Sequence, residues 1–322
     1  MSQLSKLTLG CWAFAGGTEW GDQDESESIR TIHSALDQGI TSLDTAPGYG
    51  GGESERIVGN ALVGRRDKTF VATKISDGVS TESAITESCE TSLGLLQTDY
   101  IDLLQVHWAD HEVPFEETIA ALQGLKDAGK VRHIGVCNFG VIDTDGWQAA
   151  GGELFSNQLP YSLLSRAIEY EIVPQCLEKG IGILAYSPIM QGLLTGKFKT
   201  ADDVPDGRAR SRHFSTDRAL ARHGGPGCEA ETFAAIAKVG AIADGLKVSM
   251  AALALAWVVN QPAISSAIIG ARNPGQVAEN LSALTIQIDD ELDAALKVAT
   301  DVVKDFLGTN PDLWAAESRY AL

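Results

Sequence analysis

The sequence lacks any long run of apolar residues. Nowhere in its 322 residues does an apolar stretch approach the roughly 20 residues that a helix needs to cross a bilayer. Met1–Gly10 also lack the basic start and apolar stretch of a secretory signal. Because 44% of the residues are hydrophobic, the chain can still build a core. We therefore expect a soluble, cytoplasmic protein that does not bind membranes.

Cysteine is scarce, and its positions form no pattern. The five cysteines are odd in number, widely spaced and free of CxxC pairs. Disulfide frameworks need paired cysteines, and zinc clusters need closely spaced ligands. We expect reduced thiols with mainly structural roles, and no metal site.

Positive charge is in short supply as well. The chain has 25 Lys and Arg against 43 Asp and Glu, a formal net charge of −18. Such a surface repels phosphate backbones, so nucleic acid is not an expected partner. A small phosphorylated ligand stays compatible with this charge, because a few local cations or a helix N-terminus can hold it.

The sequence does contain a regular alternation of short strand-like runs and longer amphipathic stretches. Eight β-branched or leucine-rich runs are predicted as strands: Leu7–Leu9, Thr41–Leu43, Thr69–Thr73, Ile101–Val106, His133–Val136, Leu154–Ser156, Ile181–Ala185 and Ser265–Ile269. The predicted helices include Glu25–Gln38, Glu53–Leu62, Thr81–Leu95, Pro114–Ala128, Ile172–Lys179, Ala230–Leu246 and Met250–Asn260. The count matches an α/β protein with a (β/α)8 TIM barrel. Doubly wound folds share the alternation, so this interpretation also depends on the residues at the end of each strand.

The whole chain, residues 1–322, is expected to form one domain. An α/β barrel takes about 250 residues plus loops, and no low-complexity tract or internal boundary interrupts the pattern. Gly129 and Gly180 are predicted to end helices in the left-handed conformation. The main irregular segment, Ile189–Gly227, is too long for an idle connection and predicts a functional loop or lid.

Polar residues come directly after seven consecutive predicted strands. In a barrel the chemistry gathers at the C-terminal strand ends, so these side chains are expected to meet at one mouth. In chain order they are Asp44, Lys74, His107, Cys137-Asn138, Asn157-Gln158, Tyr186-Ser187 and Gly270-Ala-Arg272-Asn273. A single polar residue can merely end a strand, but seven together favour a site.

Tyr49 adds a phenol on a glycine-rich turn shortly after Asp44. Carbonyl reduction needs a proton donor at the oxygen as hydride reaches the carbon, and a tyrosine with a pKa near ~10 needs help from its surroundings. Lys74 would stabilise the tyrosinate, and Asp44 would hold the lysine. His107 would orient the carbonyl oxygen or relay a proton. The turn itself fits neither a P-loop nor GxGxxG, and its glycines would let Tyr49 approach a ligand closely.

Motifs in a fixed order resemble the aldo-keto reductase family over nearly the whole chain. They are Asp44-Thr-Ala-Pro-Gly-Tyr49-Gly, Gly52-Glu-Ser-Glu, Thr73-Lys74, Val106-His107, Gly129-Lys-Val-Arg-His-Ile-Gly135-Val-Cys-Asn138-Phe, Asn157-Gln158-Leu-Pro-Tyr-Ser162, Tyr186-Ser-Pro188 and Gly270-Ala-Arg-Asn273-Pro-Gly-Gln276-Val-Ala-Glu279-Asn280. The resemblance implies an NADP(H)-dependent oxidoreductase that reduces aldehydes and ketones or oxidises sugar and polyol alcohols. The segment Gly308–Trp314 is similar to the bacterial branch that contains sugar, polyol and general aldehyde reductases.

The resemblance also implies residue roles. Asp44, Tyr49, Lys74 and His107 would be the catalytic residues, with Tyr49 as general acid in reduction. Asn138 and Gln158 would bind the nicotinamide carboxamide, and Tyr186 would stack on the ring. The other implied cofactor contacts are Ser187, Leu194, Gly196, Lys197, Gly270, Arg272, Gln276 and Asn280.

Arg272 favours NADP(H) as cofactor. An arginine can pair bidentately with a phosphate, whereas selectivity for the unphosphorylated cofactor more often places an acid near the ribose. The alternative is a solvated arginine neutralised by Glu279. Arg208, Arg210 and Arg212 would add charge near the pyrophosphate, but a solvated basic loop explains them equally well, so they are not predicted site residues.

The chain departs from the family in a few places. Its first strand starts within about ten residues of Met1, so the usual N-terminal hairpin is expected to be shortened or absent. Cys137 stands where the family often has serine. Trp20 and Trp108 are predicted to line the substrate pocket, and Trp12 and Trp314 fit either that role or packing.

Two other functions are compatible with parts of the sequence. One is a nicotinamide-binding regulatory or sensory subunit with little turnover, which a stable partner complex would favour. The other is a Schiff-base enzyme acting through Lys74, which fits poorly because a neighbouring Asp keeps the amine charged. The sequence favours the oxidoreductase with a small carbonyl or sugar substrate, and it predicts no particular oligomeric state.

Overall fold

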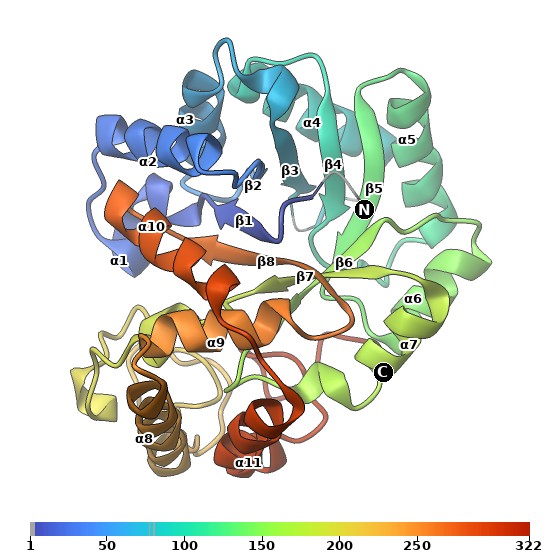
Figure 1. The fold of residues 1–322 in the computed structure, drawn as a ribbon. Coiled ribbons are helices and arrows are strands. Elements are labelled where there is room, and N and C mark those ends of the chain that lie inside the picture. The colour runs from blue at the N-terminus through green and yellow to red at the C-terminus, as the bar shows by residue number, and fades with distance from the viewer. Residues whose placement is uncertain (1–3, 77, 80) are drawn as a thin grey trace.

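The computed structural model describes residues 4–76, 78–79 and 81–322 as a closed barrel. Its eight parallel strands are each paired with the next, and β8 pairs with β1. They are β1 (Leu7–Gly10), β2 (Ser42–Asp44), β3 (Phe70–Ile75), β4 (Ile101–Val106), β5 (Val131–Cys137), β6 (Ser156–Pro160), β7 (Gly182–Tyr186) and β8 (Ile264–Gly270). Helices surround the ring of strands on the outside (Figure 1). The predicted (β/α)8 barrel is confirmed.

The helices follow the strands along the chain. They are α1 (Gly17–Trp20), α2 (Glu25–Asp37), α3 (Glu53–Ala61), α4 (Glu82–Leu96), α5 (Phe115–Asp127), α6 (Val141–Ala149), α7 (Ile172–Lys179), α8 (Glu229–Leu246), α9 (Met250–Val259), α10 (Pro274–Ser282) and α11 (Asp290–Leu307). Gly129 and Gly180 end α5 and α7 with φ of +75° and +66°, as predicted. Two strand-to-strand connections contain more than one α-helix: α1 and α2 lie between β1 and β2, and α8 and α9 lie between β7 and β8; α10 and α11 follow β8.

One predicted strand was misplaced. The prediction set the sixth strand at Leu154–Ser156, whereas β6 runs from Ser156 to Pro160. Its residues Asn157 and Gln158 are buried although they are polar. Hydrophobicity therefore pointed to the apolar residues before the strand, because the strand itself carries buried polar side chains.

The barrel interior changes from apolar to polar along the strands. Phe70, Ala72, Leu103, Leu184 and Ile268, from four strands, pack into one buried cluster. Residues two apart on a strand share a face, so Lys74 points inward like Phe70 and Ala72, one step nearer the C-terminal end. The apolar layer thus supports a polar layer above it, which contains Lys74.

The described segment before β1, residues 4–6, is short and irregular. Residues 4–6 form no strand, and Leu4 packs against the interior cluster together with Phe155. Residues 1–3 lie outside the described part of the chain. The described residues therefore contain no hairpin before β1, in agreement with the expectation.

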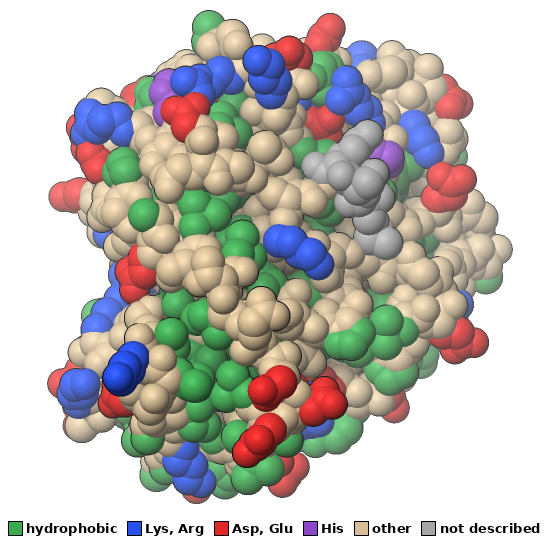
Figure 2. All heavy atoms as spheres, in the orientation of Figure 1, with side chains coloured by type: hydrophobic (Ala, Val, Ile, Leu, Met, Phe, Trp, Pro, Cys, Tyr) green, Lys and Arg blue, Asp and Glu red, His purple; other side chains and the backbone are tan. Residues whose placement is uncertain are grey.

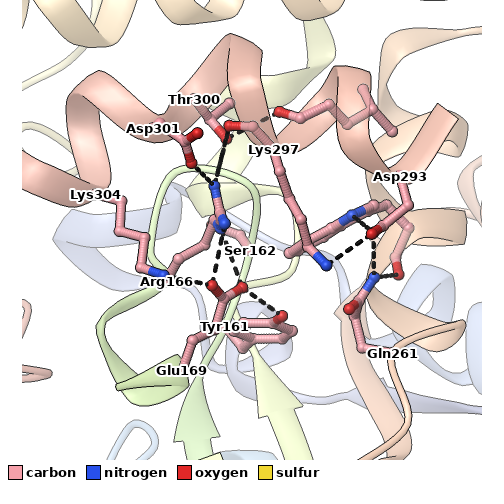
Figure 3. Close-up of polar contacts among 12 residues, drawn as sticks. Tyr161, Ser162, Arg166, Glu169, Gln261, Asp293, Lys297, Thr300, Asp301 and Lys304 are labelled. Atoms are coloured by element: carbon pink, nitrogen blue, oxygen red, sulfur yellow. Dashed lines mark hydrogen bonds and ion pairs between the residues drawn. The ribbon is translucent and has the colours of Figure 1, made fainter. Parts of the chain in front are cut away.

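A buried ion-pair network anchors α11 to the barrel (Figure 3). The side chain of Arg166, in the β6–α7 connection, is 4% exposed and donates to Asp301 at 2.8 Å and to Glu169 at 3.0 Å. Glu169 also accepts from Lys304 of α11 and from the Tyr161 hydroxyl, each at 2.8 Å. These contacts tie the last helix to the segment that follows β6.

The length and composition of the outer helices are relevant to the expectation that no segment crosses a membrane. Within the described ranges no single helix is long and apolar enough to cross a membrane; α8 and α9 pass only as a pair, bent by 96° at their junction. On the face in Figure 2, hydrophobic side chains gather over α8 and α9, and acidic side chains lie close together over α11.

Candidate active site

A cavity of about 1550 Å³ opens at the C-terminal ends of the strands. Fifteen predicted site residues line it: Trp20, Asp44, Tyr49, His107, Trp108, Asn138, Gln158, Tyr186, Ser187, Gly196, Lys197, Gly270, Arg272, Gln276 and Asn280. Two do not. Lys74 lies just beneath the surface of the cavity, in contact with Asp44 and Tyr49. Leu194 is fully buried in the hydrophobic core, so its side chain does not face the cavity.

The structure brings the four predicted catalytic residues to one end of the cavity. Lys74 Nζ donates to Asp44 Oδ1 and to the carbonyl of Thr45, each at 2.8 Å, and lies 3.4 Å from the Tyr49 hydroxyl oxygen. His107 follows β4 and lines the same cavity. A carboxylate, an ammonium and a phenol therefore form a continuous chain that ends at the cavity.

Burial sets the protonation of this chain. Burial raises the pKa of Tyr49 to about 12, although the Lys74 charge lowers it. For Lys74, burial acts to lower the pKa, but the charge of Asp44, together with Tyr49 and Cys137, outweighs burial and holds the pKa above its usual value. At a pH near 7 the phenol of Tyr49 is therefore uncharged and the amine of Lys74 is protonated. The expected stabilisation of the tyrosinate by Lys74 is therefore only partial.

The glycine-rich turn and a tryptophan fix the position of Tyr49. Gly50, Gly51 and Gly52 all have positive φ, between +64° and +94°, a region that other residues rarely adopt. A Cβ at Gly50 would lie 2.8 Å from the Ala15 side chain, so a larger residue would clash. Trp12 stacks on the Tyr49 ring with centroids 5.3 Å apart. The three glycines are therefore needed for the backbone conformation of the turn that carries Tyr49.

Asn138, Gln158 and Tyr186 form a second group beside the first. Gln158 Nε2 donates to Asp44 Oδ2 at 2.8 Å, which links this group to the catalytic residues. The Tyr186 hydroxyl donates to Asn138 Oδ1 at 3.1 Å. Asn138 and Ser187 have φ of +58° and +54°, and such strained backbone is typical of functional sites.

Three cations gather on the far wall of the cavity. A Cβ at Gly192 would lie 3.1 Å from Lys197 Nζ and 3.9 Å from Arg208 Nη1, so both cations surround this glycine. Burial and then the charge of Arg208 lower the pKa of Lys197; burial and then the charge of Arg272 lower the pKa of Arg208. Cations that disfavour one another in this way suit an anionic ligand, and a nucleotide phosphate fits them.

Arg272 is held from one side by the loop that precedes α2. Its Nε donates to Gln23 Oε1 at 2.7 Å, its Nη1 donates to the Trp20 carbonyl at 2.7 Å, and its Nη2 donates to the Asp22 carbonyl. Gln23 Nε2 returns a bond to the Arg272 carbonyl at 3.1 Å. Each terminal nitrogen of the guanidinium keeps a second hydrogen, so the fork can still bind a phosphate.

The long segment 189–227 contains only short 3-10 turns, at Met190–Thr195 and Ala201–Asp203. Several of its residues line the cavity, Lys197, Arg208 and Arg210 among them. Arg212 instead donates to the Leu307 and Asn310 carbonyls, each at 3.0 Å, and so fastens the loop to the chain after α11. The three arginines thus have different environments, which their common spacing in sequence did not reveal.

Sequence reasoning missed some residues of the cavity wall. The sequence does not single out Arg208, because a solvated loop explains it equally well, or Trp12, because packing explains it equally well. Gln23 and Tyr320 do not line the cavity themselves but hold residues that do, and they gave no signal because their partners lie some 250 and 182 positions away in the sequence. Such long-range contacts become visible only in the folded chain.

Comparison with known proteins agrees with this geometry. The model of the "Aldo/keto reductase family" matches residues 6–299. An "NADH-specific methylglyoxal reductase" of Escherichia coli (strain K12) is 37% identical, over 89% of this chain and 92% of that protein.

Two solved structures are similar as well. The glycerol dehydrogenase AKR11B4 from Gluconobacter oxydans has a TM-score of 0.79 and 34% identity, covering 92% of this chain and 91% of its own. An aldo/keto reductase from Klebsiella pneumoniae, in complex with NADP and acetate, has a TM-score of 0.74 and 28% identity, covering 92% of each chain.

The fold and these matches define a barrel oxidoreductase that transfers hydride between a nicotinamide and a carbonyl or alcohol carbon. The chain belongs to the aldo/keto reductase family, which generally uses NADP(H). The alternative of a sensory subunit with little turnover gains no support from these comparisons.

Proposed function

We propose that this chain reduces small aldehydes or ketones, or oxidises sugar and polyol alcohols, with Tyr49 as the acid or base and NADP(H) as the cofactor. The observation that carries the proposal is the chain from Asp44 through Lys74 to the Tyr49 hydroxyl, at 2.8 and 3.4 Å. It ends at the cavity that His107 also lines. The nicotinamide, when bound, supplies or accepts the hydride.

The protein's own residues handle the proton. In reduction, the neutral Tyr49 hydroxyl donates its proton to the substrate oxygen as negative charge develops there. Lys74 stabilises the tyrosinate left behind, and Asp44 balances the lysine charge inside the buried site. His107 orients the substrate oxygen by hydrogen bonding. In oxidation the proton moves the other way, so Tyr49 must first lose it.

The positions of the predicted cofactor residues in or beside the cavity are compatible with the cofactor roles that the family resemblance implies. Asn138 and Gln158 would bind the carboxamide, and Tyr186 would stack on the nicotinamide. Lys197 and Arg208 would bind the pyrophosphate, together with the backbone at Ser187, Leu194 and Gly196. Arg272 would pair with the 2′-phosphate, and Gly270, Gln276 and Asn280 would complete the adenosine side.

Arg272 supports a preference for NADPH over NADH. A bidentate arginine is strongly favourable only when the phosphate is present. One relative is described as NADH-specific, so the family alone does not fix the preference. In this chain Arg272 is pre-oriented by Gln23 and two carbonyls, which supports the phosphorylated cofactor.

Trp20 and Trp108 line the cavity and are proposed as walls of the substrate pocket. Aromatic walls suit a small carbonyl compound or a sugar, whose carbon skeleton packs on the rings. We keep the cytoplasm as the proposed location and residues 1–322 as the proposed single domain.

The test is a titration followed by an assay. Purified protein is titrated with NADPH and with NADH by tryptophan fluorescence, and then mixed with a panel of aldehydes, ketones and sugars. The proposal predicts tighter binding of NADPH and its oxidation by at least one member of the panel. If neither NADPH nor NADH binds to the protein, the proposal is contradicted.

A further inference from the structure

The C-terminal tail closes one side of the cavity and reaches the cofactor residues. We propose that Tyr320 is a positioning residue for the reaction, because its hydroxyl holds the side-chain amide of Asn138 in one orientation. This inference rests on the proposed function, in which Asn138 binds the nicotinamide carboxamide.

The tail is fastened at several points. Arg319 pairs with the fully buried carboxylate of Asp312 through bonds of 2.6 and 3.0 Å. The backbone N–H of Ala321 donates to Asp143 Oδ2 at 2.9 Å. The Ala321 carbonyl accepts from the Ile142 N–H at 3.0 Å. The chain end thus lies beside α6 (Figure 1).

Gly140 makes this close approach possible. A Cβ there would lie 2.0 Å from the Ala321 carbonyl oxygen, far inside any real contact. The strand β5 ends only three residues earlier, so the tail touches the barrel directly at the strand end that carries Asn138. The tail is therefore packed into the site.

Tyr320 makes the decisive contact. Its side chain is 4% exposed, and its hydroxyl donates to Asn138 Oδ1 at 2.7 Å. Tyr186 donates to the same oxygen at 3.1 Å, and Asn138 Nδ2 donates to the His107 carbonyl at 3.1 Å. A flipped amide would bring its oxygen against the His107 carbonyl, so the three bonds together select one orientation.

The hydroxyl matters beyond packing. The Tyr320 ring packs edge-on against Trp108, with centroids 5.6 Å apart, and a phenylalanine would make the same contact. A buried hydroxyl is costly unless it is hydrogen-bonded, and this one bonds to a side chain whose backbone is already strained at φ +58°. The tail thus supports both the cofactor side, through Asn138, and the substrate side, through Trp108.

The test uses Tyr320→Phe, which keeps the ring and removes only the hydroxyl. We expect the Kd for NADPH to rise about 3- to 10-fold, the range for losing one hydrogen bond, while the KM for the carbonyl substrate changes little. Tyr170→Phe is the matched control, because Tyr170 is 40% exposed and not part of the cavity wall. The thermal midpoint is measured for each variant.

A double-mutant cycle shows whether Tyr320 acts through Asn138. In an Asn138→Ala background, Tyr320→Phe should cause no further change in the Kd for NADPH. An unchanged Kd in the single Tyr320→Phe variant, or an effect that persists without Asn138, would overturn the inference while the proposed function stands. Wild-type protein that binds neither nucleotide would overturn both.

Discussion

At the scale of single residues, the site depends on a few charged groups that neutralise or repel one another. Lys74 is buried against Asp44, which makes its charge tolerable inside the barrel. Arg208 and Lys197 face the cavity near a third cation, Arg272. The charges of the first arrangement are neutralised within the protein, whereas the phosphates of the proposed cofactor would neutralise those of the second.

Arg208 provides a residue-scale prediction. Arg208→Gln should raise the Kd for NADPH about 10-fold or more, because a hydrogen bond to a charged phosphate is worth about 1.5–3 kcal/mol. The difference in affinity between the two proteins should shrink as salt is added, since salt screens the attraction between Arg208 and the phosphate in wild type. Arg30→Gln, on the exposed side of α2, is the control. Equal nucleotide affinity of Arg208→Gln and wild type would remove Arg208 from the site.

At the scale of elements, two connections matter most. The loop before α2 holds Arg272 through Gln23, and the β6–α7 connection holds α11 through Arg166. Both are contacts between segments far apart in the sequence. We expect a mutation in the first connection to change the preference for NADPH, and a mutation in the second to change the stability of the fold.

Gln23→Ala should reduce the preference for NADPH. Arg272 would lose its bond at Nε and the returned bond to its carbonyl and keep only the bonds to the Trp20 and Asp22 carbonyls, so its fork would be less firmly pre-oriented. We expect the Kd for NADPH to rise about 3- to 10-fold and the Kd for NADH to stay unchanged. Parallel titrations measure this, and an equal loss for both nucleotides would show that the loop acts on another part of the cofactor.

Arg166→Met should destabilise the fold without changing the site. Glu169 would keep Lys304 and Tyr161 but lose its buried guanidinium, and losing hydrogen bonds between charged groups costs about 1.5–3 kcal/mol. Urea unfolding measures the change. Arg30→Met removes an exposed partner and should have little effect. Comparable stabilities of the two variants would show that the network in Figure 3 does not anchor α11.

Elements were predictable where hydrophobic periodicity and end signals agreed. Seven predicted strands overlap observed ones closely, and β4 has the predicted bounds. The helix α6 was not predicted, because Thr144, Asp145 and Gly146 are poor helix formers. It is stabilised instead by the hydrogen bond from the Gly140 N–H to the Asp143 carboxylate at 2.8 Å and by contacts with the C-terminal tail. α11 carried its signal in sequence, with Asp289 as N-cap and buried residues from Leu296 to Leu307, but it lies beyond the last predicted strand.

At the scale of the whole molecule, the site could be predicted because the barrel gathers its strand ends. Asp44, His107 and Asn138 are far apart in sequence, yet closure of the barrel brings them to one cavity. The roles of Tyr320 and Gln23 could not be predicted, because they come from connections whose path the strand pattern does not determine. The pattern locates the strand ends, and the folded loops supply their partners.

A buried histidine makes the stability of the whole molecule depend on pH. Burial lowers the pKa of His213 to about 4, and its Nε2 donates to the Leu164 carbonyl at 2.7 Å. The unfolded chain, with a histidine pKa of about 6.5, takes up a proton at a pH where the folded chain does not. The contribution of His213 to the stability of the fold is therefore fully present above about pH 6.5 and is lost as the pH falls toward about 4.

Urea unfolding at two pH values tests this linkage. Between about pH 7.5 and pH 5, His213 should account for a loss of about 2 kcal/mol in the free energy of unfolding. His213→Gln should lose correspondingly less over the same interval, because the other titrating groups are common to both proteins. The same pH dependence in both would show that His213 is not the cause.

The most direct test of the account concerns Tyr49. NADPH oxidation is followed with a carbonyl substrate for wild type, Tyr49→Phe and the control Tyr170→Phe. We predict that Tyr49→Phe binds NADPH like wild type but turns over roughly 100-fold more slowly, the effect of losing a general acid. Turnover equal to that of wild type would contradict the central claim that Tyr49 carries the proton.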